Sequence, residues 1–233
     1  MRNASGDCAL RALRIARMSK VAVTGGAGFI GSNLTRRLLS LGYEVNVVDD
    51  LSTGLLSNVD QDKTNFHQIT ITDPRALKNA LKDCETIFHL AARGSVPRSI
   101  KNPIATHDVN ATGTLNVLEV ARESGAHVVF SSSSSVYGRN MQLPKDESMW
   151  LGPMTPYAAS KLAGEGYVQA YASAYNCRQR CCASLMSLGH VSDLITNTRQ
   201  YYQSGSGLPC KEIQLMSTVM AQPQEISLIL KQS

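Results

Sequence analysis

A glycine-rich turn between two apolar segments constrains the fold of this chain more than any other feature of its sequence. The stretch VAVTGGAGFIGSNL runs from Val21 to Leu34 and spaces Gly25, Gly28 and Gly31 three residues apart. In a strand–turn–helix unit the first glycine permits a tight turn, and the second lets a pyrophosphate approach the backbone. The third lets the helix pack closely. The pattern therefore predicts a dinucleotide-binding turn at the start of a Rossmann-type sheet, with the phosphates at the helix N-terminus.

An acidic pair at the end of the next apolar run indicates which dinucleotide would bind. The run VNVVDD ends in Asp49 and Asp50, at the distance where such folds place an acid on the ribose. Asp49 can accept hydrogen bonds from the ribose hydroxyls, whereas its carboxylate would repel a 2′-phosphate. No lysine or arginine occurs in the following residues 51–54. The sequence therefore predicts NAD rather than NADP.

Composition and charge argue against several other classes of protein. A chain of 233 residues with 43% hydrophobic content is suited to one α/β domain, and no apolar run reaches the length of a membrane span. The net charge of +5 comes from the two ends, because basic and acidic residues balance between residues 19 and 176. A nucleic-acid footprint would instead lie on the folded surface. We expect neither a nucleic-acid nor a membrane partner.

The cysteines do not form a metal site or a disulfide framework in sequence. Cys8 and Cys84 are isolated, and the other four occur at 177, 181, 182 and 210. No CxxC pair and no histidine at ligand spacing accompanies them. We therefore expect no metal, and a reducing cytoplasm as the location.

Strand and helix patterns alternate regularly from residue 20 onward. Strands are predicted at 21–24, 44–49, 65–69, 86–90 and 127–131, and helices at 28–41, 74–82, 103–124 and 156–175. This alternation predicts an α/β fold, a doubly wound parallel sheet (Rossmann fold) with helices on both faces. Ligands of such sheets bind beyond the carboxyl ends of the strands.

Three segments differ in their patterns. Residues 1–17 carry four arginines and lack both a strand pattern and the apolar centre of a signal peptide. We expect a disordered N-terminal extension there, with an organelle presequence as the alternative. Residues 18–177 are expected to form the NAD-binding domain with the catalytic motif. Residues 178–233 show little periodicity, and we expect a poorly ordered tail.

A serine-rich strand end and a later helix supply candidate catalytic groups. VVFSSSSSVYG contains Ser133, and PYAASK places Tyr157 and Lys161 four residues apart, on one helix face. A nearby ammonium, together with the positive ring of NAD⁺, is expected to lower the pKa of the Tyr157 phenol and enable general acid–base work. Ser133 could hold the same substrate oxygen. Each motif alone would also fit a solvated helix face or a flexible loop.

Taken together, these motifs resemble the extended short-chain dehydrogenase/reductase superfamily, in particular its NAD-dependent sugar-nucleotide epimerases. The resemblance extends from residue 20 to 176 and rests on TGGAGFIGSNL, VVDDLSTG, TIFHLAARGSVPRS, VNATGTLNVLEVAR, FSSSSSVYG and PYAASKLAGE. It implies a UDP-sugar substrate, with Ser133 and Tyr157 at the sugar 4-hydroxyl and Lys161 on the nicotinamide ribose. The implied cofactor-binding set is Gly25, Gly28, Phe29, Ile30, Gly31, Asp49, Asp50, Leu90, Ala91, Ala92, Asn110, Tyr157 and Lys161.

The resemblance also implies a reaction. Tyr157 would remove the hydroxyl proton while C4 gives a hydride to NAD⁺, and the resulting 4-keto sugar would turn over and take the hydride back on its other face. Related dehydratases and decarboxylases carry acidic residues where this chain has Ser134 and Ser135, so epimerisation is favoured. Two departures stand out: Thr70 replaces an acid expected near the adenine, and Gly94 a lysine found in some epimerases.

Beyond residue 176 the resemblance ends abruptly. Permitted codons for residues 180–192, read in a displaced frame, can encode LLRFVNVFGPRQ, which is similar to the next family segment. We therefore expect a frameshifted or truncated C-terminal part without the substrate lobe, and impaired turnover. A homodimer through helices 103–124 and 156–175 is a further expectation. An NAD(P)-dependent reductase and a non-catalytic dinucleotide-binding protein are the alternative functions.

Overall fold

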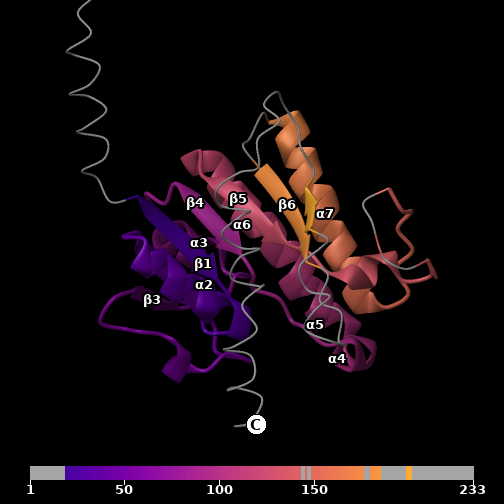
Figure 1. The fold of residues 1–233 in the computed structure, drawn as a ribbon, viewed down its shortest axis with the longest axis horizontal. Coiled ribbons are helices and arrows are strands. Elements are labelled where there is room, and N and C mark those ends of the chain that lie inside the picture. Colours follow the sequence, from indigo (N-terminus) through magenta and orange to yellow (C-terminus); the bar gives the residue numbers. More distant parts are fainter. Residues whose placement is uncertain (1–18, 143–144, 146–147, 176–178, 185–197, 201–233) are drawn as a thin grey trace, which may run out of the picture.

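A seven-stranded sheet forms the centre of the described part of the chain (Figure 1). The computed structural model describes residues 19–142, 145, 148–175, 179–184 and 198–200. The strands are β1 (Lys20–Thr24), β2 (Glu44–Asp49), β3 (Asn65–Gln68), β4 (Thr86–His89), β5 (His127–Ser131), β6 (Gln179–Ser184) and β7 (Thr198–Gln200). Their order is β3-β2-β1-β4-β5-β6-β7, and only β7 pairs in the antiparallel direction. The chain therefore reverses its winding direction between β1 and β4, which is where such sheets bind ligands.

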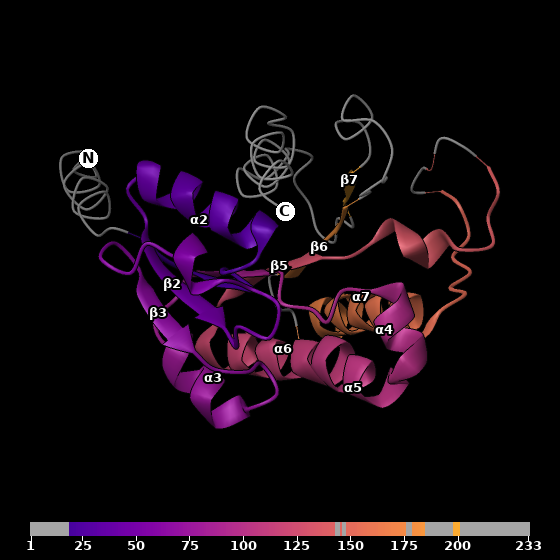
Figure 2. The same cartoon turned by 90° about the horizontal axis from the view of Figure 1, so that it is seen from below.

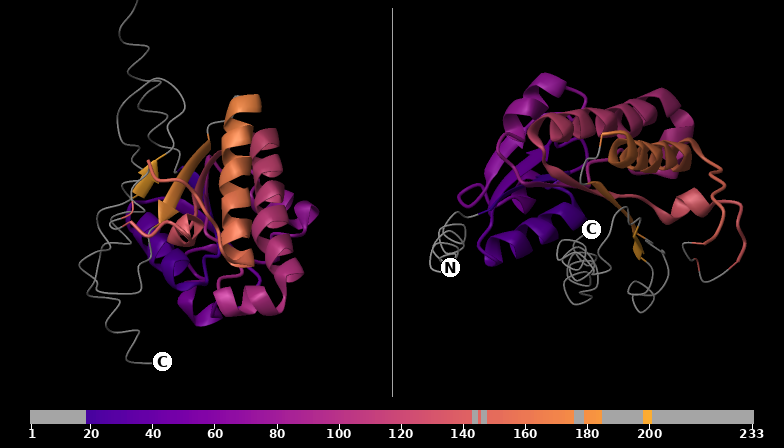
Figure 3. Two further views of the ribbon diagram at one scale, coloured as in Figure 1. Left: turned by 90° about the vertical axis from the view of Figure 1, so that its right-hand side faces the viewer. Right: turned by 90° about the horizontal axis from the view of Figure 1, so that it is seen from above.

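Helices cover both faces of this sheet (Figure 2). They are α2 (Phe29–Ser40), α3 (Pro74–Ala80), α4 (Val96–Lys101), α5 (Pro103–His107), α6 (Gly113–Ser124) and α7 (Pro156–Ala174), with short turns η1 (Leu56–Asn58), η2 (Asp108–Thr112) and η3 (Ser134–Tyr137). Helix α2 lies on one face, and α3, α6 and α7 lie on the other. Figure 3 shows α6 and α7 side by side, where they are in contact.

Alternation along the strands builds a separate hydrophobic core on each face. Val21 and Val23 of β1 pack with Leu34 and Leu38 of α2, whereas Ala22 between them packs in the core beneath α3, α6 and α7. Successive strand side chains point to opposite faces, so a strand buried on both sides must be apolar throughout. This explains why the β1 and β2 sequences are rich in valine.

The predicted doubly wound parallel sheet is confirmed by this architecture. Each of the five predicted strands agrees with an observed strand to within one residue at either end. The segment predicted as one helix at 103–124 is instead α5, a π-helical turn (η2) and α6. Helix α4 was not predicted. Ser95 caps it by accepting from the Arg98 nitrogen, and a proline lies in its first turn, but the six-residue helix is too short to show helical periodicity.

The prediction of a tail without regular structure is wrong for two short segments. Strand β6 pairs in parallel with β5 over Val128↔Gln179 to Ser131↔Cys182, and β7 pairs with β6. A parallel strand needs only backbone groups for its ladder, so the open edge of β5 accepts a segment that has no strand periodicity. The rest of 178–233, and the extension at 1–17, lie outside the described residues. The proposed domain limits at 18–177 remain a prediction.

Membrane insertion has no support in the described helices. None of them has both the length and the apolar character that a span requires.

Candidate dinucleotide and catalytic site

The glycine turn after β1 is held in place by close backbone contacts. Gly25 has a positive φ of 74° and donates its N–H to the Val48 carbonyl at 2.7 Å. A Cβ at Gly25 would lie 2.7 Å from the Ala91 nitrogen, and a Cβ at Gly31 would lie 2.1 Å from the Gly25 oxygen. The first glycine is therefore required by the neighbouring β4 end, and the third by the turn itself.

Helix α2 begins at this turn with its N-terminus available to an anion. Gly28 is the N-cap residue and provides no side-chain cap, and the first helical turn contains no acidic residue. The first amide groups of a helix lack intrahelical partners and carry partial positive charge. A phosphate at this position would satisfy them. Phe29, which begins the helix, is 39% exposed, and Ile30 is half-buried.

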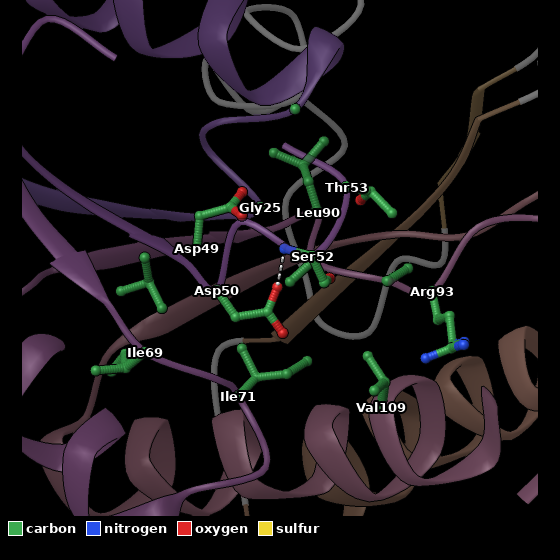
Figure 4. A pocket seen from close by; sticks show the side chains of 14 residues that line it. Gly25, Asp49, Asp50, Ser52, Thr53, Ile69, Ile71, Leu90, Arg93 and Val109 are labelled. Atoms are coloured by element: carbon green, nitrogen blue, oxygen red, sulfur yellow. Dashed lines mark hydrogen bonds between the residues drawn. The ribbon is translucent and has the colours of Figure 1, made fainter. Parts of the chain in front are cut away.

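A cavity of about 170 Å³ opens directly beside the turn (Figure 4). It lies at the carboxyl ends of β1, β2, β3 and β4, the edge of the sheet where the sequence predicted ligand binding. Seven predicted residues line it: Gly25, Gly28, Asp49, Asp50, Leu90, Ala91 and Ala92. The other lining residues were not predicted: Val48, Ser52, Thr53, Ile69, Ile71, Arg93 and Val109. All of these except Val109 lie in the last two residues of a predicted strand or within four residues after it, which is the signal that could have identified them.

The two acids at the end of β2, Asp49 and Asp50, both line the cavity but make different hydrogen bonds. Buried Asp49 accepts hydrogen bonds from the Ala27 nitrogen at 3.0 Å and from the Leu51 nitrogen at 2.9 Å. Its carboxylate therefore links the glycine turn to the end of β2, and each oxygen keeps a lone pair for a further donor. Asp50 is exposed and accepts from the Ser52 nitrogen at 2.9 Å, as Figure 4 shows.

The candidate catalytic side chains come from the end of β5 and the start of α7. Ser133 caps η3, and its oxygen accepts from the Ser135 nitrogen at 3.3 Å and from the Ser135 hydroxyl at 2.9 Å. The Ser133 side chain also lies near the Tyr157 phenol and lowers its pKa. Because Ser133 accepts twice from Ser135, its own proton stays available for another acceptor. The fold thus brings together two groups that are 24 positions apart.

The pKa of Tyr157 is raised by burial, whereas the sequence predicted that it would be lowered. Removal of the phenol from water raises the pKa of Tyr157, and the nearby Ser133 side chain only partly opposes this. Lys161 is not among the groups that shift it. Lys161 is itself buried, and its ammonium donates to the Ser131 carbonyl at 2.9 Å and lies 4.9 Å from the Phe130 ring centroid. The predicted lowering of this pKa by Lys161 is therefore not what the structure shows, because desolvation dominates.

Asn110 connects the two halves of the site rather than lining the cavity. It lies in the π-helical turn η2, and its side-chain oxygen accepts from the Arg93 nitrogen at 2.7 Å. Its amide donates to the Ser160 hydroxyl on α7 at 2.9 Å. One side chain thus links the end of β4 to the catalytic helix. Its predicted role in direct cofactor contact stays a prediction, whereas its positioning contacts are visible.

Fully buried His89 continues this network beneath the cavity. Its ring nitrogens contact the Thr24 hydroxyl at 2.7 Å and the Thr114 hydroxyl at 3.0 Å. Burial, with a smaller contribution from the charge of Lys161, lowers the pKa of His89 to about 3. The ring is therefore neutral at physiological pH and serves as a hydrogen-bonding link.

Acidification is expected to destabilise the protein through His89. In the unfolded chain this histidine takes up a proton below its ordinary pKa of 6.5, whereas in the folded protein it stays neutral down to about 3. Between these values the unfolded state binds more protons, so the free energy of unfolding falls by up to about 1.4 kcal/mol per pH unit. Urea unfolding at several pH values between 7 and 4 measures this dependence of the free energy of unfolding on pH. His89→Gln should reduce the dependence, and His107→Gln, at an exposed position, should leave it unchanged. Equal slopes in all three proteins would contradict the assignment.

Metal ligation has no support among the described residues. They contain no group of three or more histidine, cysteine, aspartate or glutamate side chains that could hold an ion. Burial raises the pKa of the Cys84 thiol to about 11, which keeps it protonated. The expectation of a metal-free site stays a prediction for the whole chain.

Known proteins are similar to this chain over its sheet-forming part. Residues 21–196 match the NAD dependent epimerase/dehydratase family. The UDP-glucose 4-epimerase of Mycolicibacterium smegmatis is 43% identical over 162 residues, covering 66% of this chain and 51% of that protein. UDP-glucuronic acid decarboxylase 1 of Danio rerio is 37% identical over 161 residues, covering 65% and 37%. The crystal structure of the Thermus thermophilus UDP-glucose 4-epimerase in complex with NAD is 35% identical with a TM-score of 0.66, covering 70% and 53%. The chain spans about half the length of the curated relatives it matches.

Proposed function

The chain belongs to the NAD dependent epimerase/dehydratase family, and we propose that it is by descent a UDP-hexose 4-epimerase acting through a transient 4-keto sugar. The observation that carries this proposal is the position of the Ser133 side chain near the Tyr157 phenol, whose pKa it lowers. Both groups lie at the edge of the sheet that is formed by the carboxyl ends of its strands, near buried Lys161. This arrangement can move a proton at one substrate oxygen.

The residues beside the cavity fit a dinucleotide. Gly28 lines the cavity, and a Cβ there would meet only the Gly25 oxygen, at 3.2 Å, so a side chain at this position would occupy space that the ligand needs. The Asp49 carboxylate retains acceptor capacity for ribose hydroxyls beyond its two backbone donors. The glycine turn, the uncapped helix and the acid together suit NAD.

Proton transfer in the proposed reaction belongs to Tyr157 and Ser133. Burial raises the pKa of the Tyr157 phenol, so a donor or a positive charge must stabilise the phenolate before it can accept the sugar proton. The Ser133 hydroxyl is such a donor, because its acceptor lone pairs already face Ser135. We place the sugar 4-hydroxyl between these two side chains.

Lys161 supplies the positive charge on the same helix. Its ammonium donates to the Ser131 carbonyl, and an ammonium group has three donor protons in all. We propose that the ribose hydroxyls next to the nicotinamide accept a hydrogen bond from it. NAD, when bound, takes up and returns a hydride at the sugar C4, so that it is not consumed.

The residues after Ser133 favour epimerisation over elimination or decarboxylation. Ser134 and Ser135 stand where related enzymes with those activities carry acids, and a serine hydroxyl is too weak an acid and too weak a base to replace such a group by itself near neutral pH. In this structure Ser135 donates to Ser133, which is a positioning contact and not an acid–base one. The similarity to a decarboxylase therefore supports the shared NAD site and first oxidation step.

Incubation with UDP-sugars tests the proposal. We expect the chain to bind NAD and to interconvert UDP-glucose and UDP-galactose more slowly than a full-length relative, without net formation of NADH. Stoichiometric NADH would indicate a dehydrogenase or reductase, and NAD binding without conversion would indicate a dinucleotide-binding protein. Either result would contradict the epimerase assignment. The same assay tests the expected impairment when its rate is compared with that of a full-length relative.

Self-association through the faces of α6 and α7 is a further part of the proposal. Both helices lie on the same side of the sheet. Light scattering of the purified chain measures whether it forms a dimer.

A further inference from the structure

Arg93 has a buried side-chain donor that lacks a hydrogen-bond partner in the part of the chain that the structure describes. It follows β4 closely and lines the same cavity as Gly28, Asp49 and Asp50 (Figure 4). Its Nε atom is buried and has no hydrogen-bond partner among the described residues. Buried polar atoms nearly always have a partner, because an unpaired donor loses its hydration without compensation. The Arg93 Nε donor therefore needs a partner that the described residues do not supply.

The backbone around Arg93 is fixed, although its side chain is not paired. Asn110 accepts the Arg93 main-chain N–H at 2.7 Å, which holds the residue at the edge of the sheet. The nearby acids are bound elsewhere: Asp49 accepts from two backbone amides, and one oxygen of Asp50 accepts from Ser52. No ion pair of the described residues includes Arg93. Its position is thus determined without an acidic partner.

Charge balance in the cavity indicates what this partner is. Its lining contains two carboxylates, and Arg93 is the one cationic side chain among the residues that line it. A ligand that carries two phosphate charges would be repelled by the carboxylates unless a cation lay close by. A guanidinium presents parallel N–H donors that match phosphate oxygens.

We propose that Arg93 binds a diphosphate of the nucleotide in this cavity. This contact comes from the segment after β4, whereas the helix N-terminus of the glycine turn belongs to α2. The proposal rests on the proposed function for the presence of a dinucleotide. A nucleotide sugar carries the same diphosphate chemistry, so binding of both ligand classes must be measured.

Calorimetric titration of Arg93→Met tests this assignment. NAD, ADP-ribose and UDP serve as diphosphate ligands, and adenosine, followed by saturation-transfer NMR, serves as the ligand without phosphate. We expect about ten-fold to hundred-fold weaker binding of NAD and ADP-ribose, as for one hydrogen bond to a charged group, with adenosine unchanged. Arg93→Lys should lose less. Arg75→Met, at an exposed position on α3, is the matched control and should bind like wild type.

The outcomes separate the inference from the proposed function. Weaker binding of UDP alone would support a diphosphate contact and identify the nucleotide sugar as its source. Unchanged binding of every diphosphate ligand to Arg93→Met would overturn the inference while leaving the NAD site intact. An equal loss for adenosine would overturn it as well, because it would show a general distortion. A wild-type chain that binds none of these ligands would overturn both.

Discussion

Replacing Tyr157 with phenylalanine is expected to slow UDP-sugar interconversion by about 10²- to 10⁴-fold, the usual contribution of a positioned acid–base group. The change removes only the phenol oxygen, whose pKa responds to the nearby Ser133 side chain, and leaves the ring in place. Because the cavity is lined by other residues, the affinity for NAD should stay close to that of wild type. Coupled assays for UDP-glucose and UDP-galactose, together with NAD titration, measure the two effects separately.

Tyr167→Phe is the matched control for this experiment. Tyr167 lies on the same helix, α7, and is 37% exposed, so loss of its hydroxyl should change neither rate nor affinity. A Tyr157→Phe protein that turns over as fast as wild type would show that the phenol does not move the proton. A parallel loss of NAD binding would point to a structural defect instead.

Gly31→Ala is expected to cost about 3 kcal/mol of stability or more, at or above the upper end of overpacking changes. The added Cβ would lie 2.1 Å from the Gly25 oxygen and 2.7 Å from the Gly26 Cα. Both are backbone atoms, which cannot move without displacing α2 from the sheet. NAD affinity should fall together with stability, because the same turn contacts the cavity. Urea unfolding followed by circular dichroism measures the first effect, and NAD titration the second.

Gly166→Ala is the contrasting substitution, at a helical glycine where an added side chain has room. Gly166 is exposed on α7, and a Cβ there meets nothing within 4 Å, so the change should stabilise the protein by up to about 1 kcal/mol through helix propensity. If Gly31→Ala were as well tolerated as Gly166→Ala, the close packing of the glycine turn would be refuted.

Several elements could be predicted because their signals are local. The strands β1, β2 and β5 are short segments rich in valine, and α2 and α7 have long helical patterns. The π-helical turn η2 has no such signal. It depends on how Asn110 meets both Arg93 and Ser160, which are distant in sequence. Strand β6 likewise depends on the open edge of β5 and not on its own periodicity.

The cavity shows the same division between local and distant information. The glycines and Asp49 were predicted from spacing, because a turn, a helix start and a strand end are properties of adjacent residues. Ile71, Val109 and Arg93 come from other segments and reach the cavity only through the packing of the sheet. The spacing of residues along the chain does not reveal which distant segments lie together in the folded protein.

Sequence alone determined the alternation of the first five strands with helices, the dinucleotide turn, and the identity of the chemical groups at Ser133, Tyr157 and Lys161. The tertiary structure decided the state of those groups. Burial raises the pKa of Tyr157 and directs the Lys161 ammonium to a backbone carbonyl, and the Arg93 Nε atom has no partner among the described residues. The reason is physical: solvent exclusion and hydrogen bonding depend on which distant residues surround a group, and only the folded chain brings them together.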